Sequence, residues 1–187
     1  MPMLALLALP AAARIAHYEL DPVHTRVLFT CNHFGYSNAL GTFSRPTGTL
    51  SFDPDDWSRA RLDVSIDLTT LDLGDAQFNQ RILRRDFLDA QAHPVARFVS
   101  TQVEPLDRTR ARVHGLLSLR GVERPLTLEV TLNRLARNRY TMRRTAGFSA
   151  RATLPRADFG ITASPGVIGA HVELRIEAEA VRSRATR

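Results

Sequence analysis

The chain has 187 residues, 44% of them hydrophobic, and a formal net charge of +6. This length and composition favour one globular domain that is stable without disulfides, and they exclude wholesale disorder. The only cysteine, Cys31, excludes an internal disulfide. The basic residues are all arginine and are scattered without interleaved aromatic residues, so we expect no nucleic-acid partner.

Residues 1–16 have the character of a secretory signal segment. Residues 3–13 are apolar and end in three alanines, which resemble a signal cleavage site. A truncated start would explain the missing basic n-region. The segment is too short to span a membrane, which takes about 20 apolar residues. We therefore expect export, with a folded domain over residues 17–182 and a basic tail over residues 183–187.

Alternation of apolar and polar residues predicts antiparallel strands along most of the chain. The expected strands lie around residues 27–33, 47–52, 62–68, 96–101, 112–119, 126–132, 145–154 and 172–180. Turn residues, such as those at 53–56 and 164–166, separate them. About eight strands with one apolar face each predict an all-β barrel or sandwich.

Residues 74–94 break the alternation. Phe78, Ile82 and Phe87 have roughly helical spacing, Asp75 is suited to cap a helix, and Pro94 to end it. We expect a helical insertion over about residues 75–92, between two strands.

Several inward positions carry small side chains, which favours a cavity inside the barrel. An eight-stranded barrel is just wide enough to be filled by side chains or to hold one ligand. Large residues on facing strands could also fill the space, so both readings stay open. The small residues are Gly115, Ala150, Ala152, Ala178 and Ala180.

Residues 23–35 place two histidines close to Cys31. Residues two apart on a strand share a face, so Cys31 and His33 could converge, whereas His24 falls on the other parity. A zinc site needs three or four protein ligands, and there is no second cysteine and no HxH or HExxH pattern, so we expect no metal. An imidazole on an inward face needs a hydrogen-bond partner. His33 is therefore either a polar contact on a cavity wall or a satisfied core histidine.

An ordered set of motifs resembles the YceI-like family of bacterial polyisoprenoid-binding proteins. The motifs cover about residues 17–182 and read YELDPVHTRVLFTCNHFGYSNALGTF, SRPTGTLSFDPDD, LDVSIDLTTLDLG, RDFLDAQAHPVARFVS, VHGLLSLRGVERPLTLEV, GFSARATLPRADFGI and VIGAHVELRIEAEA. The resemblance implies an eight-stranded, lipocalin-like antiparallel barrel in the periplasm. Its apolar tunnel would hold a polyprenyl lipid or an isoprenoid quinone as ligand, without a cofactor or a catalytic step. A homodimer would be consistent with the family.

With this resemblance, we expect a set of ligand-binding residues that combines inward aromatic and aliphatic side chains with two polar contacts. Arg81 stands for the arginines at 81–85, which would either favour an anionic head group or form a solvated helix face. The expected set is Val27, Phe29, His33, Phe43, Phe78, Arg81, Ile82, Phe87, Phe98 and Phe148. Two alternatives remain: an enzyme that acts on such a lipid with His33 or His24 as general base near Asp21, and an interaction barrel with a filled lumen.

Overall fold

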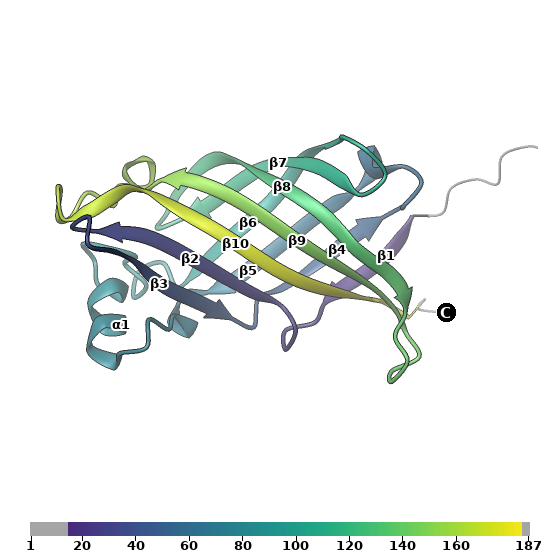
Figure 1. The fold of residues 1–187 in the computed structure, drawn as a ribbon, viewed down its shortest axis with the longest axis horizontal. Helices are drawn as coiled ribbons and strands as arrows, with labels where there is room; N and C mark the ends of the chain where they lie inside the picture. The colour runs from purple at the N-terminus through teal and green to yellow at the C-terminus, as the bar shows by residue number, and fades with distance from the viewer. Residues whose placement is uncertain (1–14, 185–187) are drawn as a thin grey trace, which may run out of the picture.

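The computed structural model describes residues 15–184, whose strands form one antiparallel sheet closed into a barrel (Figure 1). The sheet order is β1-β4-β5-β6-β7-β8-β9-β10-β2-β3, and a further pairing of β1 with β10 closes the barrel. The strands are β1 (Ala16–Leu20), β2 (Arg26–His33), β3 (Ser37–Ser44), β4 (Thr47–Phe52), β5 (Arg61–Asp67), β6 (Val95–Pro105), β7 (Arg110–Leu119), β8 (Val122–Arg137), β9 (Arg144–Pro155) and β10 (Ile168–Arg182).

The ten strands fill eight positions around the barrel, because β1 and β2 share the position beside β10, and β3 and β4 share the next one. β1 pairs with the C-terminal part of β10, through Tyr18 and Arg182, and β2 pairs with the N-terminal part, through Cys31 and Val172. β4 then follows β1, and β3 follows β2. The expected eight-stranded antiparallel barrel is confirmed. The expected strands are all present, but β1 and β3 were missed, β3 because Leu40 is exposed on a mostly polar and small strand.

The helical insertion is shorter than the expected range of 75–92. α1 spans Ala76–Leu83 and begins as expected, since the Asp75 carboxylate accepts a hydrogen bond of 2.8 Å from the backbone N–H of Phe78. It ends at Leu83 because Arg84 adopts an extended backbone. Tight turns follow as far as His93, with Asp89 in the left-handed region at a φ of 50°. Three short 3₁₀ helices complete the helical structure: η1 (Trp57–Arg59), η2 (Leu68–Thr70) and η3 (Arg156–Phe159).

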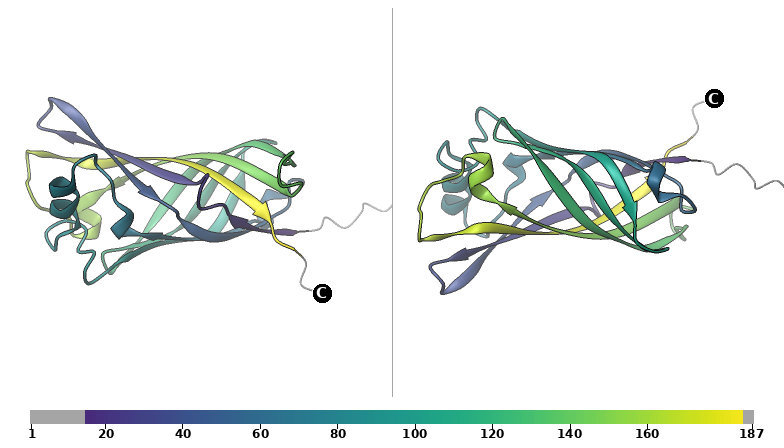
Figure 2. Two further views of the ribbon diagram at one scale, coloured as in Figure 1. Left: turned by 90° about the horizontal axis from the view of Figure 1, so that it is seen from below. Right: turned by 90° about the horizontal axis from the view of Figure 1, so that it is seen from above.

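The two ends of the barrel differ. α1 and the turn between β2 and β3 lie at one end, and the hairpin between β8 and β9 projects at the other, near the end of β10 (Figures 1 and 2). β1 begins at Ala16, so nearly all of the expected signal segment lies outside the described residues. Within residues 15–184, the helices fall short of the length and apolar character needed to cross a membrane.

Two glycines make room for aromatic rings inside the barrel. A Cβ atom at Gly115 would overlap the ring of Phe98, and one at Gly41 would overlap the ring of Phe29. The space that the small residue leaves at Gly115 is therefore filled by Phe98.

Candidate functional site

The lumen contains two apolar cavities of about 160 and 170 Å³. We call the first the Trp57 cavity and the second the Phe87 cavity. No polar atom is exposed in the wall that the described residues form around either one. Both cavities are lined by Val27, Ile66, Leu117 and Leu174, so these four side chains lie where the cavities meet.

The Trp57 cavity is bounded by an aromatic cluster and two alanines. The ring of Phe52 meets those of Trp57 and Phe148 edge to face, at centroid distances of 5.0 and 5.6 Å. Ala150 and Ala178 line the same cavity. Of the five small residues expected to face a cavity, these two do so. Gly115, Ala152 and Ala180 line neither cavity, and at Gly115 the ring of Phe98 takes the space.

Trp57 also carries an unpaired polar atom beneath the cavity wall. Its indole Nε1 is buried and has no hydrogen-bond partner among the described residues. A buried donor without a partner destabilises the fold unless water or a ligand satisfies it. Trp57 is the only tryptophan of the chain, so its fluorescence reports on this cavity alone.

The Phe87 cavity is covered by α1 and the turns after it. Ile82 and Phe87 line it from this side, and Phe29, Cys31 and Phe43 line it from β2 and β3. The rings of Phe29 and Phe43 are 5.5 Å apart. These contacts make α1 a cover over one end of the lumen (Figure 1).

The structure assigns seven of the ten expected ligand-binding residues to cavity walls. Val27 lines both cavities. The other six each line one: Phe29, Phe43, Ile82 and Phe87 the Phe87 cavity, and Phe98 and Phe148 the Trp57 cavity.

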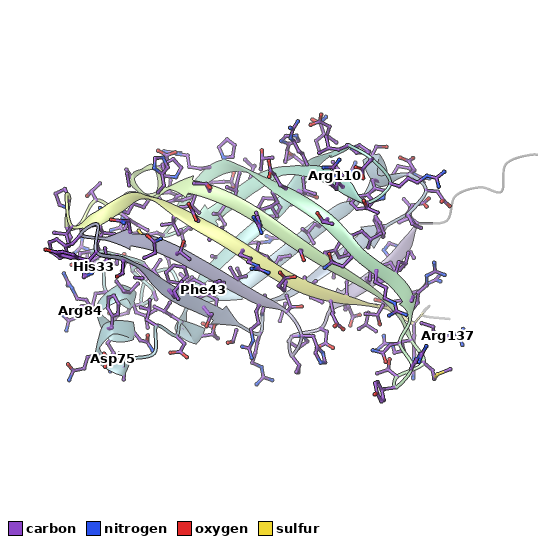
Figure 3. All side chains as sticks on the ribbon, viewed as in Figure 1. His33, Phe43, Asp75, Arg84, Arg110 and Arg137 are labelled. Atoms are coloured by element: carbon purple, nitrogen blue, oxygen red, sulfur yellow. The ribbon has the colours of Figure 1, made fainter. Side chains whose placement is uncertain are left out.

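The remaining three face away from the lumen, which corrects the inward positions expected for His33 and Phe78 and leaves Arg81 on an exposed helix face, one of its two expected settings. His33 is exposed at the last residue of β2, where the strand turns away from the barrel, and its ring packs edge to face on Phe34 at 4.9 Å (Figure 3). Phe78 lies on the exposed side of the short α1, with 37% of its surface accessible. Arg81 forms a salt bridge of 2.7 Å with Asp86, and its guanidinium lies over the Phe87 ring, 5.0 Å from the ring centroid.

Cys31 has the environment of an unreactive core thiol. It is half-buried in the wall of the Phe87 cavity, and its Sγ–H donates to the carbonyl of Gly169 at 3.5 Å. Burial raises the pKa of the Cys31 thiol, so the neutral form is favoured. The inward Cys31 and the exposed His33 do not share a site.

Arg156 is a buried cation that sequence analysis missed. Its guanidinium donates to the carbonyls of Ile161, Ala163, Ile168 and Gly169 at distances of 2.7–3.2 Å. It forms no salt bridge within the described part of the chain. The side chain therefore ties the loop after η3 to β10, and its stem lines the Phe87 cavity. A lone arginine at the end of a strand carries no sequence pattern that distinguishes it from a surface residue.

A second polar group lies outside the lumen, at the turn between β1 and β2. His24 Nδ1 lies 2.9 Å from Asp21 Oδ2, and Glu179 is close enough for all three to approach one ion. The hydrogen bond to Asp21 raises the pKa of His24. Neither His24 nor Asp21 lines the Trp57 cavity or the Phe87 cavity.

The family model described as the YceI-like domain matches residues 18–180. The chain belongs to the YceI-like family. Among curated relatives of this YceI-like chain, the UPF0312 protein of Pseudomonas savastanoi pv. phaseolicola is 35% identical over 174 residues, covering 92% of this chain and 90% of the relative. The UPF0312 protein of Shewanella oneidensis is 32% identical over 175 residues, covering 92% and 91%.

Solved structures of other proteins share the barrel. The crystal structure of BcnA from Burkholderia cenocepacia superposes with a TM-score of 0.78 at 21% identity, covering 86% of this chain and 98% of BcnA. A polyisoprenoid binding domain from Saccharophagus degradans, implicated in plant cell wall breakdown, superposes with a TM-score of 0.65 at 17% identity, covering 91% and 100%. At these identities, the likeness shows a common fold.

Proposed function

We propose that this YceI-like protein binds the apolar tail of an isoprenoid amphiphile, such as a polyprenyl lipid or an isoprenoid quinone, inside its barrel. The observation that carries the proposal is the pair of cavities whose exposed walls are entirely apolar. Leaving such a tail in water costs about 0.8 kcal/mol per CH₂ group, which the lumen would recover. The polyisoprenoid binding domain of Saccharophagus degradans, with the same fold, supports this ligand class.

The size of the cavities sets a requirement on the bound state. A dry, apolar cavity of about 150 Å³ holds one molecule of the size of benzene. Each cavity, at about 160 and 170 Å³, therefore accommodates only a short piece of a prenyl chain. A longer tail requires the two cavities to join, and Val27, Ile66, Leu117 and Leu174 are the side chains that would have to move.

The head group belongs at an end of the lumen. The exposed walls offer it no polar partner, so a charged head inside either cavity would remain unsolvated. A neutral quinone carbonyl is a better fit, because the unpaired indole N–H of Trp57 could donate to it after a small adjustment. A carrier or scavenger in the periplasm is the role that agrees with these features and with the apolar N-terminal segment of the sequence.

Native mass spectrometry of the protein isolated from bacterial cells, followed by organic extraction, tests the proposal. We expect a stoichiometric adduct whose mass matches a prenyl lipid or quinone, and which also gives the tail length. A protein that is empty and does not take up added polyprenol or quinone would favour an interaction barrel with a filled lumen. Turnover of the added lipid would favour an enzyme.

A further inference from the structure

The hairpin between β8 and β9 carries a concentration of positive charge. Its tip, residues 138–143, projects beyond the barrel at the end opposite α1, as the positions of Arg137 and Arg84 show (Figure 3). No aspartate or glutamate occurs between Glu129 and Asp158. The arginines gathered here, which we call the hairpin arginine cluster, are Arg134, Arg137, Arg139, Arg143, Arg144 and Arg182.

The cluster forms one surface because the strands and the C-terminal end of the barrel bring its members together. Arg137 and Arg144 are direct cross-strand partners in the pairing of β8 with β9. The guanidinium of Arg143 donates to the backbone carbonyl of Arg182 at 2.8 Å, which joins the hairpin to the end of β10. Two shallow hollows of about 310 and 300 Å³ lie among these side chains.

The cluster lacks the counter-charges that a purely structural role would call for. None of its members forms a salt bridge with a described residue, although arginines elsewhere pair with Asp63, Asp86, Asp107, Glu104 and Glu177. Like charges directly opposite each other in a sheet destabilise it, so the pairing of Arg137 with Arg144 weakens the hairpin. Glu179, in one hollow, and Glu19, which accepts a hydrogen bond from Ser183, are the nearby carboxylates and do not offset the cluster.

The tip of the same hairpin exposes two apolar side chains. Tyr140 is 97% exposed and Met142 is 59% exposed. The tip is nevertheless ordered, because the Asn138 side chain accepts hydrogen bonds from the backbone N–H groups of Tyr140 and Thr141, at 2.9 and 3.1 Å. An ordered tip with an aromatic residue between arginines has the composition of a membrane-interface contact, in which the ring enters the head-group layer and the arginines meet phosphates.

We propose that the hairpin arginine cluster and the tip residues Tyr140 and Met142 dock this protein on the surface of an anionic phospholipid membrane. The docking is peripheral and salt-dependent, since exposed charges supply most of the attraction. This docking turns one end of the barrel toward the bilayer. The Trp57 cavity lies toward that end, since Phe148, which lines it, is only four positions after Arg144 on β9. The inference does not depend on the proposed function, because it concerns the outer surface rather than the lumen.

Co-sedimentation of the full chain with vesicles of phosphatidylcholine, with and without phosphatidylglycerol, tests the proposal. The test variant is R134Q/R137Q/R139Q/R144Q, which leaves the Arg143 contact to Arg182 intact. The control variant, R45Q/R84Q/R85Q/R151Q, removes the same net charge from exposed arginines that lie away from the hairpin tip. None of the eight side chains makes a hydrogen bond or ion pair with another residue in the range 15–184, so both variants should fold.

We expect the wild-type protein to bind only the phosphatidylglycerol vesicles, and less tightly as salt is raised. Each basic residue near an anionic surface contributes about fivefold to the partition coefficient, so the test variant should lose about a hundredfold or more. The control variant should lose less than about threefold, because its arginines stay distant from the surface. Y140S/M142S should reduce binding by about tenfold without changing its salt dependence.

Three results would overturn the proposal. Equal losses in the two arginine variants would mean that net charge alone drives binding. A wild-type protein that ignores phosphatidylglycerol vesicles but binds heparin through the hairpin would indicate an anionic polymer as the partner. An unchanged affinity of Y140S/M142S would remove the tip from the contact. A variant with a blocked lumen, A150L, should bind the vesicles normally, which separates this test from that of lipid binding inside the barrel.

Discussion

Filling the Trp57 cavity provides a test that separates a ligand lumen from a packed core. Ala150 lies on β9, is 7% exposed and lines this cavity of about 160 Å³. Ala150→Leu adds three carbon atoms to a space that no side chain occupies. At about 0.8 kcal/mol per buried CH₂ group, the free energy of unfolding of the empty protein should rise by about 2 kcal/mol. The melting temperature should rise by about 4–8 °C, given about 2–4 °C per kcal/mol for a chain of this size.

Ala146 is the matched control for this substitution. It lies on the same strand and the same face as Ala150, but its exposure is 0% and it lines neither cavity. Ala146→Leu should therefore overpack the core and lower the free energy of unfolding by about 1–3 kcal/mol. Thermal unfolding followed by circular dichroism measures both variants, and added prenyl lipid should stabilise the wild-type protein but not Ala150→Leu. If Ala150→Leu is destabilised as much as Ala146→Leu, the lumen is filled and the reasoning fails.

Three further substitutions test other parts of the structure. Arg156→Met leaves four carbonyl groups without a donor, so urea unfolding should show the free energy of unfolding fall by about 3 kcal/mol. Arg156→Lys should not restore this stability, because an ammonium group lacks the guanidinium fork. An unchanged stability would mean that the carbonyls have other partners. Asp21→Asn replaces the carboxylate, whose hydrogen bond and charge raise the pKa of His24, with a neutral amide, so an NMR titration should show this pKa fall toward its ordinary value. Because the pKa of His24 is raised in the folded state, the Asp21–His24 pair stabilises the fold at pH values below the unfolded-state pKa of His24. This contribution is lost as the pH rises through the folded-state pKa. A His24 pKa that does not respond to the substitution would contradict the role given to Asp21. Gly115→Ala places a Cβ against the Phe98 ring and the Val99 carbonyl oxygen, and should cost about 2 kcal/mol in the same unfolding assay, whereas a neutral effect would show that β6 and β7 adjust freely.

The barrel could be predicted because its strands repeat one physical pattern. Residues such as Leu126 and Leu128 on β8 alternate with polar neighbours, and the structure buries both leucines. The same parity argument placed Val27, Phe29 and Cys31 on the lumen wall. It failed at His33, because alternation assigns a face only while the strand stays in the barrel, and β2 ends there.

The features that depend on packing between distant segments were not predictable in this way. The cover formed by α1 faces the lumen through Ile82 but leaves Phe78 exposed, since the helix is only eight residues long and then turns. Trp57 reaches the lumen from the short helix η1, and Arg156 finds its four acceptors in a loop and a strand beyond it. The small inward residues indicated a cavity, but only the structure shows that Phe98 fills the space at Gly115 while that beside Ala150 stays open.

The most direct test of the central claim, that an isoprenoid tail lies inside the barrel, is a fluorescence titration of Trp57 with a prenylated quinone. Trp57 is the sole tryptophan and lines one of the two cavities, so contact quenching requires the ligand to be in the lumen. We expect saturable quenching at one quinone per protein in the wild type and none in Ala150→Leu. Quenching that persists in Ala150→Leu, or a bound quinone that leaves Trp57 unquenched, would show that the ligand does not occupy the Trp57 cavity.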